Sequence, residues 1–172
     1  MTGYGIIGCG YAGGIHADNL AKMPGTRLAA AFDTDYERAK AFAQERGAYT
    51  ASTIEELCSN REVEAVIITT PNNSHRIPAI CAAKAGKHVF CEKPVALSFE
   101  DTKEMIDTAE KAGVYFFAAH TTNFIRGVQT AKALLASGAV GELLMIEAVH
   151  TDWAGPQKFT GWKQRKDISG GH

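Results

Sequence analysis

Long apolar runs, basic clusters and paired cysteines are all missing from this sequence of 172 residues. No stretch approaches the roughly 18 consecutive apolar residues that a membrane-spanning helix needs. The 18 basic and 19 acidic residues give a formal net charge of −1, and no basic stripe stands out. We therefore expect neither nucleic acid nor a membrane as a partner.

Cysteine is scarce, and its spacing suits neither a metal site nor a disulfide framework. Cys9, Cys58, Cys81 and Cys91 form no C-x-x-C pair, and no Cys/His cluster has zinc spacing. We expect no metal site and free, mostly buried thiols, which suit a reducing compartment. The sequence opens on a strand pattern without a charged segment and a cleavable apolar one, so we predict a cytoplasmic location.

Short apolar runs alternate with helical patterns over the first two thirds of the sequence. Strands are expected at residues 4–7, 28–32, 65–69, 88–91 and 114–118, and the longer helices at residues 12–23, 74–85 and 98–112. This alternation with short connections indicates right-handed βαβ units and a parallel sheet. We predict an α/β fold, a doubly wound parallel-sheet Rossmann domain, over residues 1–120.

Capping residues mark the expected helix starts. Asp35 and Ser98 can each cap a helix, and Ser52-Thr53-Ile54-Glu55 reads as a capping box. Ser74 can cap the helix that follows it, provided that Pro78 lies in the first turn, where proline is tolerated.

The pattern changes after residue 120. A helix is expected at residues 124–136, and a longer strand at residues 141–149 has no helix pattern behind it. The remaining residues are irregular. We predict that residues 121–172 begin a second domain.

Three glycines near the N-terminus, Gly8, Gly10 and Gly13, have the spacing G-x-G-x-x-G. They follow an expected strand and open an expected helix, which is the context of a dinucleotide-binding loop. Gly8 would allow the tight turn, Gly10 the approach of a pyrophosphate, and Gly13 close helix–strand packing. The helix N-terminus would offer free N–H groups to the phosphates.

An acidic residue, Asp33, ends the second expected strand, 25 residues after Gly8. Its carboxylate would accept hydrogen bonds from the adenosine ribose and repel a 2′-phosphate, which favours NAD over NADP. Arg38 could reverse that preference. A glycine-rich turn without a ligand, or a site for a methyl donor such as S-adenosylmethionine, are the alternatives.

Polar side chains follow the later strands, where ligands bind in open α/β sheets. The segments are "TTPNNSH", "CEKPVA" and "AHTTNF". Lys93 could orient a substrate hydroxyl and carry its proton, or be a surface lysine in a turn. Glu92 could pair with Lys93 or bind a ribose, and His75 could cap its helix.

Taken together, "GCGYAGGIHA", "TTPNNSH" and "CEKP" resemble the Gfo/Idh/MocA family of oxidoreductases. The resemblance implies a Rossmann domain followed by an α+β C-terminal domain with an open, mainly antiparallel sheet. It also implies hydride transfer between nicotinamide and a secondary hydroxyl of a sugar, polyol or cyclitol.

Carried onto this sequence, the family's motifs imply a set of cofactor-binding residues: Gly8, Gly10, Tyr11, Ala12, Asp33, Thr70, Pro71, Asn72, His75, Glu92, Lys93, Trp162 and Lys163. Lys93 would also be the catalytic residue, and Pro94 often follows a cis peptide bond in this family.

The sequence departs from the family pattern at three places. Lys163 stands where arginine is usual, and it loses the bidentate fork of a guanidinium. Asn123 precedes Phe124, and Arg126 occupies a position where proline is common. The family's aspartate and histidine on a later helix would lie beyond His172, so we expect an N-terminal portion of the enzyme.

These observations predict an NAD-dependent dehydrogenase of sugars, polyols or cyclitols, with NADP as the less favoured cofactor. We expect a homo-oligomer that assembles through the C-terminal sheet. The alternative is a dinucleotide-binding module without catalysis, such as a sensor.

Overall fold

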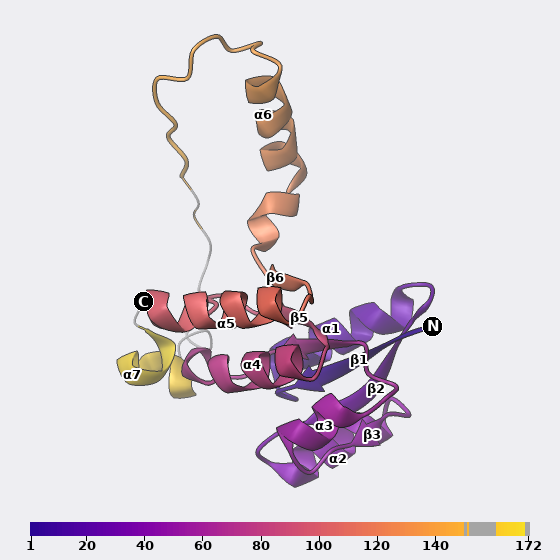
Figure 1. The fold of residues 1–172 in the computed structure, drawn as a ribbon. Coiled ribbons are helices and arrows are strands. Elements are labelled where there is room, and N and C mark those ends of the chain that lie inside the picture. The colour runs from indigo at the N-terminus through magenta and orange to yellow at the C-terminus, as the bar shows by residue number, and fades with distance from the viewer. Residues whose placement is uncertain (150, 152–160, 171–172) are drawn as a thin grey trace. The chain divides into compact units, whose positions relative to one another are not determined.

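The computed structural model of the chain describes residues 1–149, 151 and 161–170. The chain divides into two compact units (Figure 1). The first comprises Met1–Ala119 and Gly161–His172, and the second comprises His120–Thr160. The domain boundary near residue 120 stays a prediction.

A six-stranded sheet forms the centre of the first unit (Figure 1). Its strands are β1 (Thr2–Ile7), β2 (Thr26–Phe32), β3 (Tyr49–Thr50), β4 (Ala65–Ile68), β5 (His88–Cys91) and β6 (Phe116–Ala118). The order is β3-β2-β1-β4-β5-β6, and every neighbouring pair is parallel. This confirms the predicted α/β Rossmann fold, although the short strand β3 was not expected.

Five helices connect these strands: α1 (Tyr11–Lys22), α2 (Tyr36–Gln44), α3 (Ile54–Ser59), α4 (Arg76–Lys84) and α5 (Phe99–Lys111). Alternate residues of β1 enter two different cores. Ile6 packs in one with Leu20 of α1 and Phe42 of α2, and Ile7 packs in the other with Leu57 and Met105. Both faces of the sheet are therefore covered, as its continuous apolar strands require.

Local chemistry sets the helix starts. The side chain of Asp35 accepts a hydrogen bond from the Arg38 N–H at 3.1 Å, and Ser98 accepts one from the Asp101 N–H at 3.1 Å. Both expected caps are confirmed. Pro78 lies in the first turn of α4, as expected.

Two expected caps are wrong in detail. Thr53, not Ser52, is the N-cap of α3, and its hydroxyl accepts from the Glu56 N–H at 3.0 Å. The box therefore pairs Thr53 with Glu56 instead of Ser52 with Glu55. Ser74 lies in a 3₁₀ turn, η1 (Asn72–Ser74), and its hydroxyl donates to Asn73, so α4 begins only at Arg76.

The second unit contains a 3₁₀ turn, η2 (Thr121–Phe124), and helix α6 (Arg126–Ala136). The expected strand at residues 141–149 is wrong, because these residues adopt no strand in the structure. A strand is held by hydrogen bonds to a neighbouring strand. The described residues of this unit include no strand that could serve as that neighbour. The start of an antiparallel sheet is likewise not seen among them.

Two short helices, η4 (Gly161–Gln164) and α7 (Lys166–Ser169), belong to the first unit. Across the described helices of both units, none is long and apolar enough to cross a membrane.

Two adjacent glycines of α1 give opposite predictions for stability. A Cβ on Gly13 would lie 2.3 Å from the Gly8 carbonyl oxygen, whereas a Cβ on Gly14 would meet no atom within 4 Å. We expect Gly13→Ala to lower the free energy of unfolding by about 2–3 kcal/mol through overpacking. Gly14→Ala should raise it by up to about 1 kcal/mol, because alanine is the better helix former. Urea unfolding of both variants measures the two changes, and equal effects would contradict the close helix–strand contact.

Candidate cofactor site

The glycine loop lies directly against the end of β4. Gly8 has a φ of +101°, and a Cβ there would lie 2.7 Å from the carbonyl carbon of Thr69. The Gly8 N–H donates to the Phe32 carbonyl at 2.8 Å, and the Thr69 hydroxyl donates to the Gly8 carbonyl at 2.6 Å. Only glycine satisfies both the backbone angle and the close approach.

The start of α1 is open. Gly10 is its N-cap and provides no side-chain hydrogen bond, and the first turn contains no acidic residue. The N–H groups of Tyr11, Ala12 and Gly13 therefore have no partner within the helix. A Cβ on Gly10 would meet no atom within 4 Å, and Tyr11 is 88% exposed. Unpaired amides and the positive end of the helix make this a suitable place for an anionic group.

Asp33 lies beside this loop at the end of β2. One of its carboxylate oxygens accepts from the Cys9 N–H at 2.8 Å, and the other accepts from the Asp35 N–H at 3.0 Å. Arg38 lies 3.3 Å from Asp33 and 3.1 Å from Asp35, so one guanidinium bridges two carboxylates. The structure thus brings Asp33 to the glycine loop and adds a cation beside it.

Burial raises the pKa of the Cys9 thiol to about 12, and the negative charge of Asp33 adds to this. Cys9 is consequently a neutral thiol near neutral pH. Its backbone N–H, and not its side chain, connects the loop to Asp33.

Glu92 follows β5, and its side-chain partner, His16, was not predicted from the sequence. Its Oε1 lies 3.0 Å from Nε2 of His16 on α1, and its Oε2 accepts from the Lys93 N–H at 3.1 Å. The hydrogen bond from His16 holds the pKa of Glu92 below its usual value, although burial opposes this. The spacing offered a signal, since His16 lies on the buried face of α1 between Gly13 and Leu20.

Lys93 is exposed on the described surface, and a cis peptide bond joins it to Pro94, as the family resemblance implied. Its backbone is fixed through Glu92, whose own N–H donates to the Ile68 carbonyl at 3.0 Å. The side chain of Lys93 therefore starts from an anchored position at the carboxyl end of β5.

His75 is fully buried and joins two loops. Its Nε2 lies 2.9 Å from the Thr70 carbonyl oxygen, and its Nδ1 lies 3.0 Å and 3.2 Å from the carbonyl oxygens of Pro94 and Val95. It precedes α4 but makes no side-chain cap. Any contribution of His75 to a cofactor site is therefore indirect, through the loops that it holds.

Thr70 and Asn72 come from the same loop after β4. The Thr70 hydroxyl is buried, and within the described part of the chain it has no hydrogen-bond partner. Asn72 is also buried, and its amide donates to the Ser169 carbonyl at 2.7 Å. The loop is thus tied to the segment of residues 161–170.

The structure does not bring Trp162 and Lys163 to the glycine loop by any described hydrogen bond. Trp162 is half-buried, and the Lys163 ammonium lies 6.0 Å from the centre of its ring. Pro71 is half-buried and precedes η1. Among the residues described, no group of three or more His, Cys, Asp or Glu side chains is placed to hold a metal ion.

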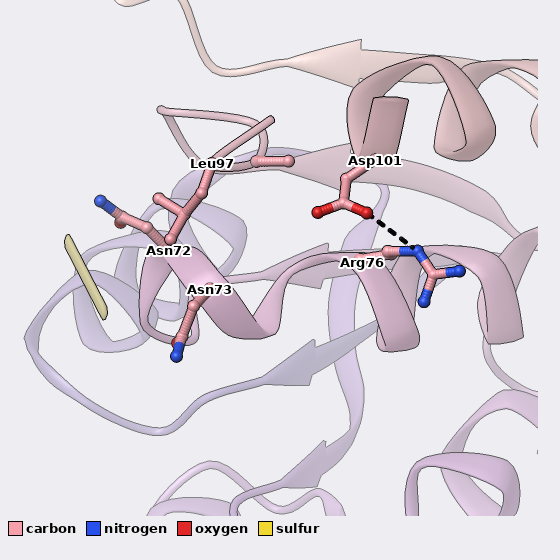
Figure 2. Close-up of a pocket in the computed structure, with 6 residues that line it drawn as sticks. Asn72, Asn73, Arg76, Leu97 and Asp101 are labelled. Carbon is pink, nitrogen blue, oxygen red and sulfur yellow. Dashed lines mark ion pairs between the residues drawn. The ribbon is translucent and has the colours of Figure 1, made fainter. Parts of the chain in front are cut away.

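A small pocket lies at the starts of α4 and α5, as Figure 2 shows. Its lining includes Asn72, Asn73, Leu97 and the ion pair of Arg76 with Asp101, whose closest atoms are 3.3 Å apart. Its volume of about 70 Å³ is too small for a dinucleotide. The open start of α1 is therefore the better candidate.

Comparison with known proteins agrees with this geometry. A model of the Gfo/Idh/MocA family, described as an oxidoreductase family with an NAD-binding Rossmann fold, matches residues 2–120. The chain is 39% identical over 172 residues to 2,7-anhydro-N-acetylneuraminate hydratase of Escherichia coli (strain K12), covering 100% of this chain and 46% of that protein. It is 33% identical over 153 residues to myo-inositol 2-dehydrogenase of Thermotoga maritima, covering 88% and 46%.

A solved structure is also similar. The WlbA dehydrogenase from Bordetella pertussis, in complex with NADH and UDP-GlcNAcA, superposes with a TM-score of 0.77 at 29% identity, over 81% of this chain and 41% of that chain. The chain spans about half the length of the curated relatives that it matches.

The lowered pKa of Glu92 predicts a pH-dependent contribution to stability. A carboxyl group whose pKa is lowered on folding stabilises the protein fully at pH values above its unfolded-state pKa, here near 4.5. This contribution is lost as the pH falls through the lower folded-state pKa. We expect Glu92→Gln to cost about 1–2 kcal/mol at pH 7. The difference from the wild type should shrink below about pH 4.5. Urea unfolding between pH 3 and pH 7 measures it, and a difference independent of pH would contradict a role for the ionised Glu92 carboxylate.

Proposed function

The chain belongs to the Gfo/Idh/MocA family of NAD-binding oxidoreductases, and on that premise we propose that the protein is an NAD-dependent dehydrogenase of carbohydrate-like substrates. It would transfer a hydride between nicotinamide and a secondary hydroxyl of a sugar, polyol or cyclitol. The observation that carries the proposal is the unblocked start of α1, which lies beside Asp33. The myo-inositol dehydrogenase among its relatives supports the substrate class.

The cofactor would be held by residues at the carboxyl ends of β1 and β2. Gly10, Tyr11 and Ala12 would offer backbone amides to the pyrophosphate, and Gly8 would form the tight turn that brings the phosphate close to them. Asp33 would offer its carboxylate to the adenosine ribose. The space around Gly10 fits the approach of a phosphate. When bound, NAD supplies the carbon that accepts or donates the hydride.

The loops after β4 and β5 would line the rest of the site. Thr70, Pro71 and Asn72 belong to the first loop, and the buried, unpaired hydroxyl of Thr70 supports a role there. Trp162 and Lys163 are proposed contributors on the resemblance alone. His75 and Glu92 would act by holding the loops in place.

Lys93 is the proposed catalytic residue. In the direction of oxidation, its neutral amine would accept the proton of the substrate hydroxyl. The carbon that bears this hydroxyl would lose its hydrogen as a hydride to the nicotinamide. A carbonyl group results, and the lysine becomes an ammonium. A second acid or base, expected on a later helix of the family's fold, would share this proton.

Three charges at the adenosine end bear on the choice between NAD and NADP. Asp33, Asp35 and Arg38 form a bridged group whose formal net charge is −1. A 2′-phosphate placed beside this group would meet net repulsion, which supports a preference for NAD. The guanidinium of Arg38 would reduce that repulsion but not reverse it.

Membership of this family also supports proposals about the substrate, the oligomeric state and the location of the protein. We propose a small carbohydrate-like substrate, a homo-oligomer, and a reducing, cytoplasmic compartment that suits the four free cysteines.

The hydratase among the relatives favours a second candidate function. That protein is 39% identical to this chain over 172 residues, compared with 33% over 153 residues for the inositol dehydrogenase. Hydration adds water without a net change in oxidation state. The two candidates therefore differ in stoichiometry, since a dehydrogenase forms one NADH per product molecule and a hydratase forms none.

We expect Lys93→Ala to lower turnover at least about 100-fold, because it removes the proposed proton acceptor. Affinity for NAD should stay within about threefold, since the glycine loop is unchanged. The matched control is Lys111→Ala at the exposed end of α5. The assay measures product and NADH together, with the full-length protein and a panel of sugars, polyols and cyclitols.

Unchanged turnover in Lys93→Ala would refute the catalytic assignment. NAD binding without turnover of any panel member would instead favour the non-catalytic module. Product formed without NADH would favour the hydratase.

Cofactor titrations test the adenosine end. We expect the wild type to bind NAD more than about tenfold more tightly than NADP, because the net charge beside the ribose is negative. Arg38→Ala should weaken NADP binding a further tenfold or so and change NAD binding less, since it removes the cation nearest a 2′-phosphate. Calorimetry with both dinucleotides measures this. Equal affinities of the wild type for NAD and NADP would contradict the proposed role of Asp33. Equal losses of NAD and NADP affinity in Arg38→Ala would contradict a specific effect of Arg38 on the 2′-phosphate.

A further inference from the structure

His16 lies at the junction between the cofactor helix and the loop that carries Lys93. It belongs to α1, and its Nε2 lies 3.0 Å from Oε1 of Glu92, beyond the end of β5. Its ring meets that of Phe90 edge-on at 5.2 Å, and Phe90 stacks on Phe117 of β6 at 5.3 Å. The side chain is only 19% exposed, so the ring is held in one place by packing as well as by its hydrogen bond.

The direction of the hydrogen bond follows from chemistry. An ionised carboxylate has only acceptor oxygens, so Nε2 of His16 is the donor. Burial of both side chains strengthens the interaction compared with a pair on the surface.

Glu92 transmits this contact to Lys93. Its second oxygen, Oε2, accepts from the backbone N–H of Lys93 at 3.1 Å. The N–H of Glu92 itself belongs to the sheet, where it donates to the Ile68 carbonyl. Two consecutive amides are therefore fixed in different ways, one by β4 and the next by a carboxylate that His16 holds.

We propose that His16 is a positioning residue for Lys93. By holding Glu92, it keeps the N–H of Lys93 bonded and so fixes where the lysine side chain begins. It connects the helix that opens at the glycine loop to the loop that carries the proposed catalytic residue. The proposal rests on the proposed function for the role of Lys93, and it gives Glu92 a part other than ribose binding.

Amide hydrogen exchange tests the contact without any catalytic assay. In His16→Leu the carboxylate loses its donor, and we expect the Lys93 amide to exchange at least about tenfold faster. The adjacent Glu92 amide should change less than about threefold, because its bond to Ile68 remains. In His16→Gln a side-chain N–H can still reach the carboxylate, so a large part of the protection should return.

His88→Leu is the matched control. Its Nδ1 accepts from the Tyr115 N–H at 3.1 Å at the beginning of β5, away from Lys93. This variant should leave the exchange of the Lys93 amide unchanged. An unchanged Lys93 amide in His16→Leu would overturn the proposal. Equal acceleration of the Lys93 and Glu92 amides in both His16 variants would also overturn it, because that pattern indicates a general loss of stability.

A kinetic test with the full-length protein addresses the consequence for catalysis. We expect His16→Leu to lower kcat about 10- to 100-fold with the KM for NAD within about threefold, and His16→Gln to recover much of kcat. An unchanged kcat in His16→Leu would overturn the positioning role. If Lys93→Ala also left turnover intact, the proposed function would fail, whereas the exchange experiment would still decide whether His16 holds the loop.

Discussion

The close approach of two main-chain segments, the glycine loop and the end of β4, is the constraint on which the rest of the first unit depends. At Gly8 the backbone has a positive φ and leaves no room for a side chain, and at Gly13 the helix lies directly on the Gly8 carbonyl. Because the segment between them carries no capping side chain, the first amides of α1 have no partner within the helix, and Gly10 and Tyr11 are exposed. The feature that packs the helix onto the sheet therefore also leaves its positive end available to an anion.

Side chains, and not the sheet alone, hold the surrounding loops together. Buried His75 joins the loop after β4 to the loop after β5, and His16 joins α1 to the same second loop through Glu92. Each contact links residues that are distant in the sequence but converge at the carboxyl edge of the sheet. A polar group buried here is costly unless it is paired, and these pairings give the edge a defined shape.

The sequence predicted the fold well where local chemistry and apolar patterning agree. The parallel arrangement of the strands could be predicted from the alternation of strand and helix patterns, and the caps at Asp35 and Ser98 from short runs of residues. The α3 cap was misplaced by one residue, since Ser52 and Thr53 are both good caps and only the geometry decides. The strand at residues 141–149 failed for another reason, because a strand depends on a partner that an apolar run does not specify.

The charges beside Asp33 show the same limit at the level of the candidate site. In the sequence, Asp33 reads as an isolated carboxylate, and Arg38 reads as a nearby cation of uncertain reach. In the structure, the first turn of α2 places the Arg38 guanidinium between the two carboxylates. One of its nitrogens donates to Asp33 and another donates to Asp35. One cation shared by two anions leaves a negative balance, whereas a cation paired with Asp33 alone would leave none. The sign of the field that an adenosine ribose would meet thus depends on Asp35, a residue whose evident role in the sequence is to cap a helix.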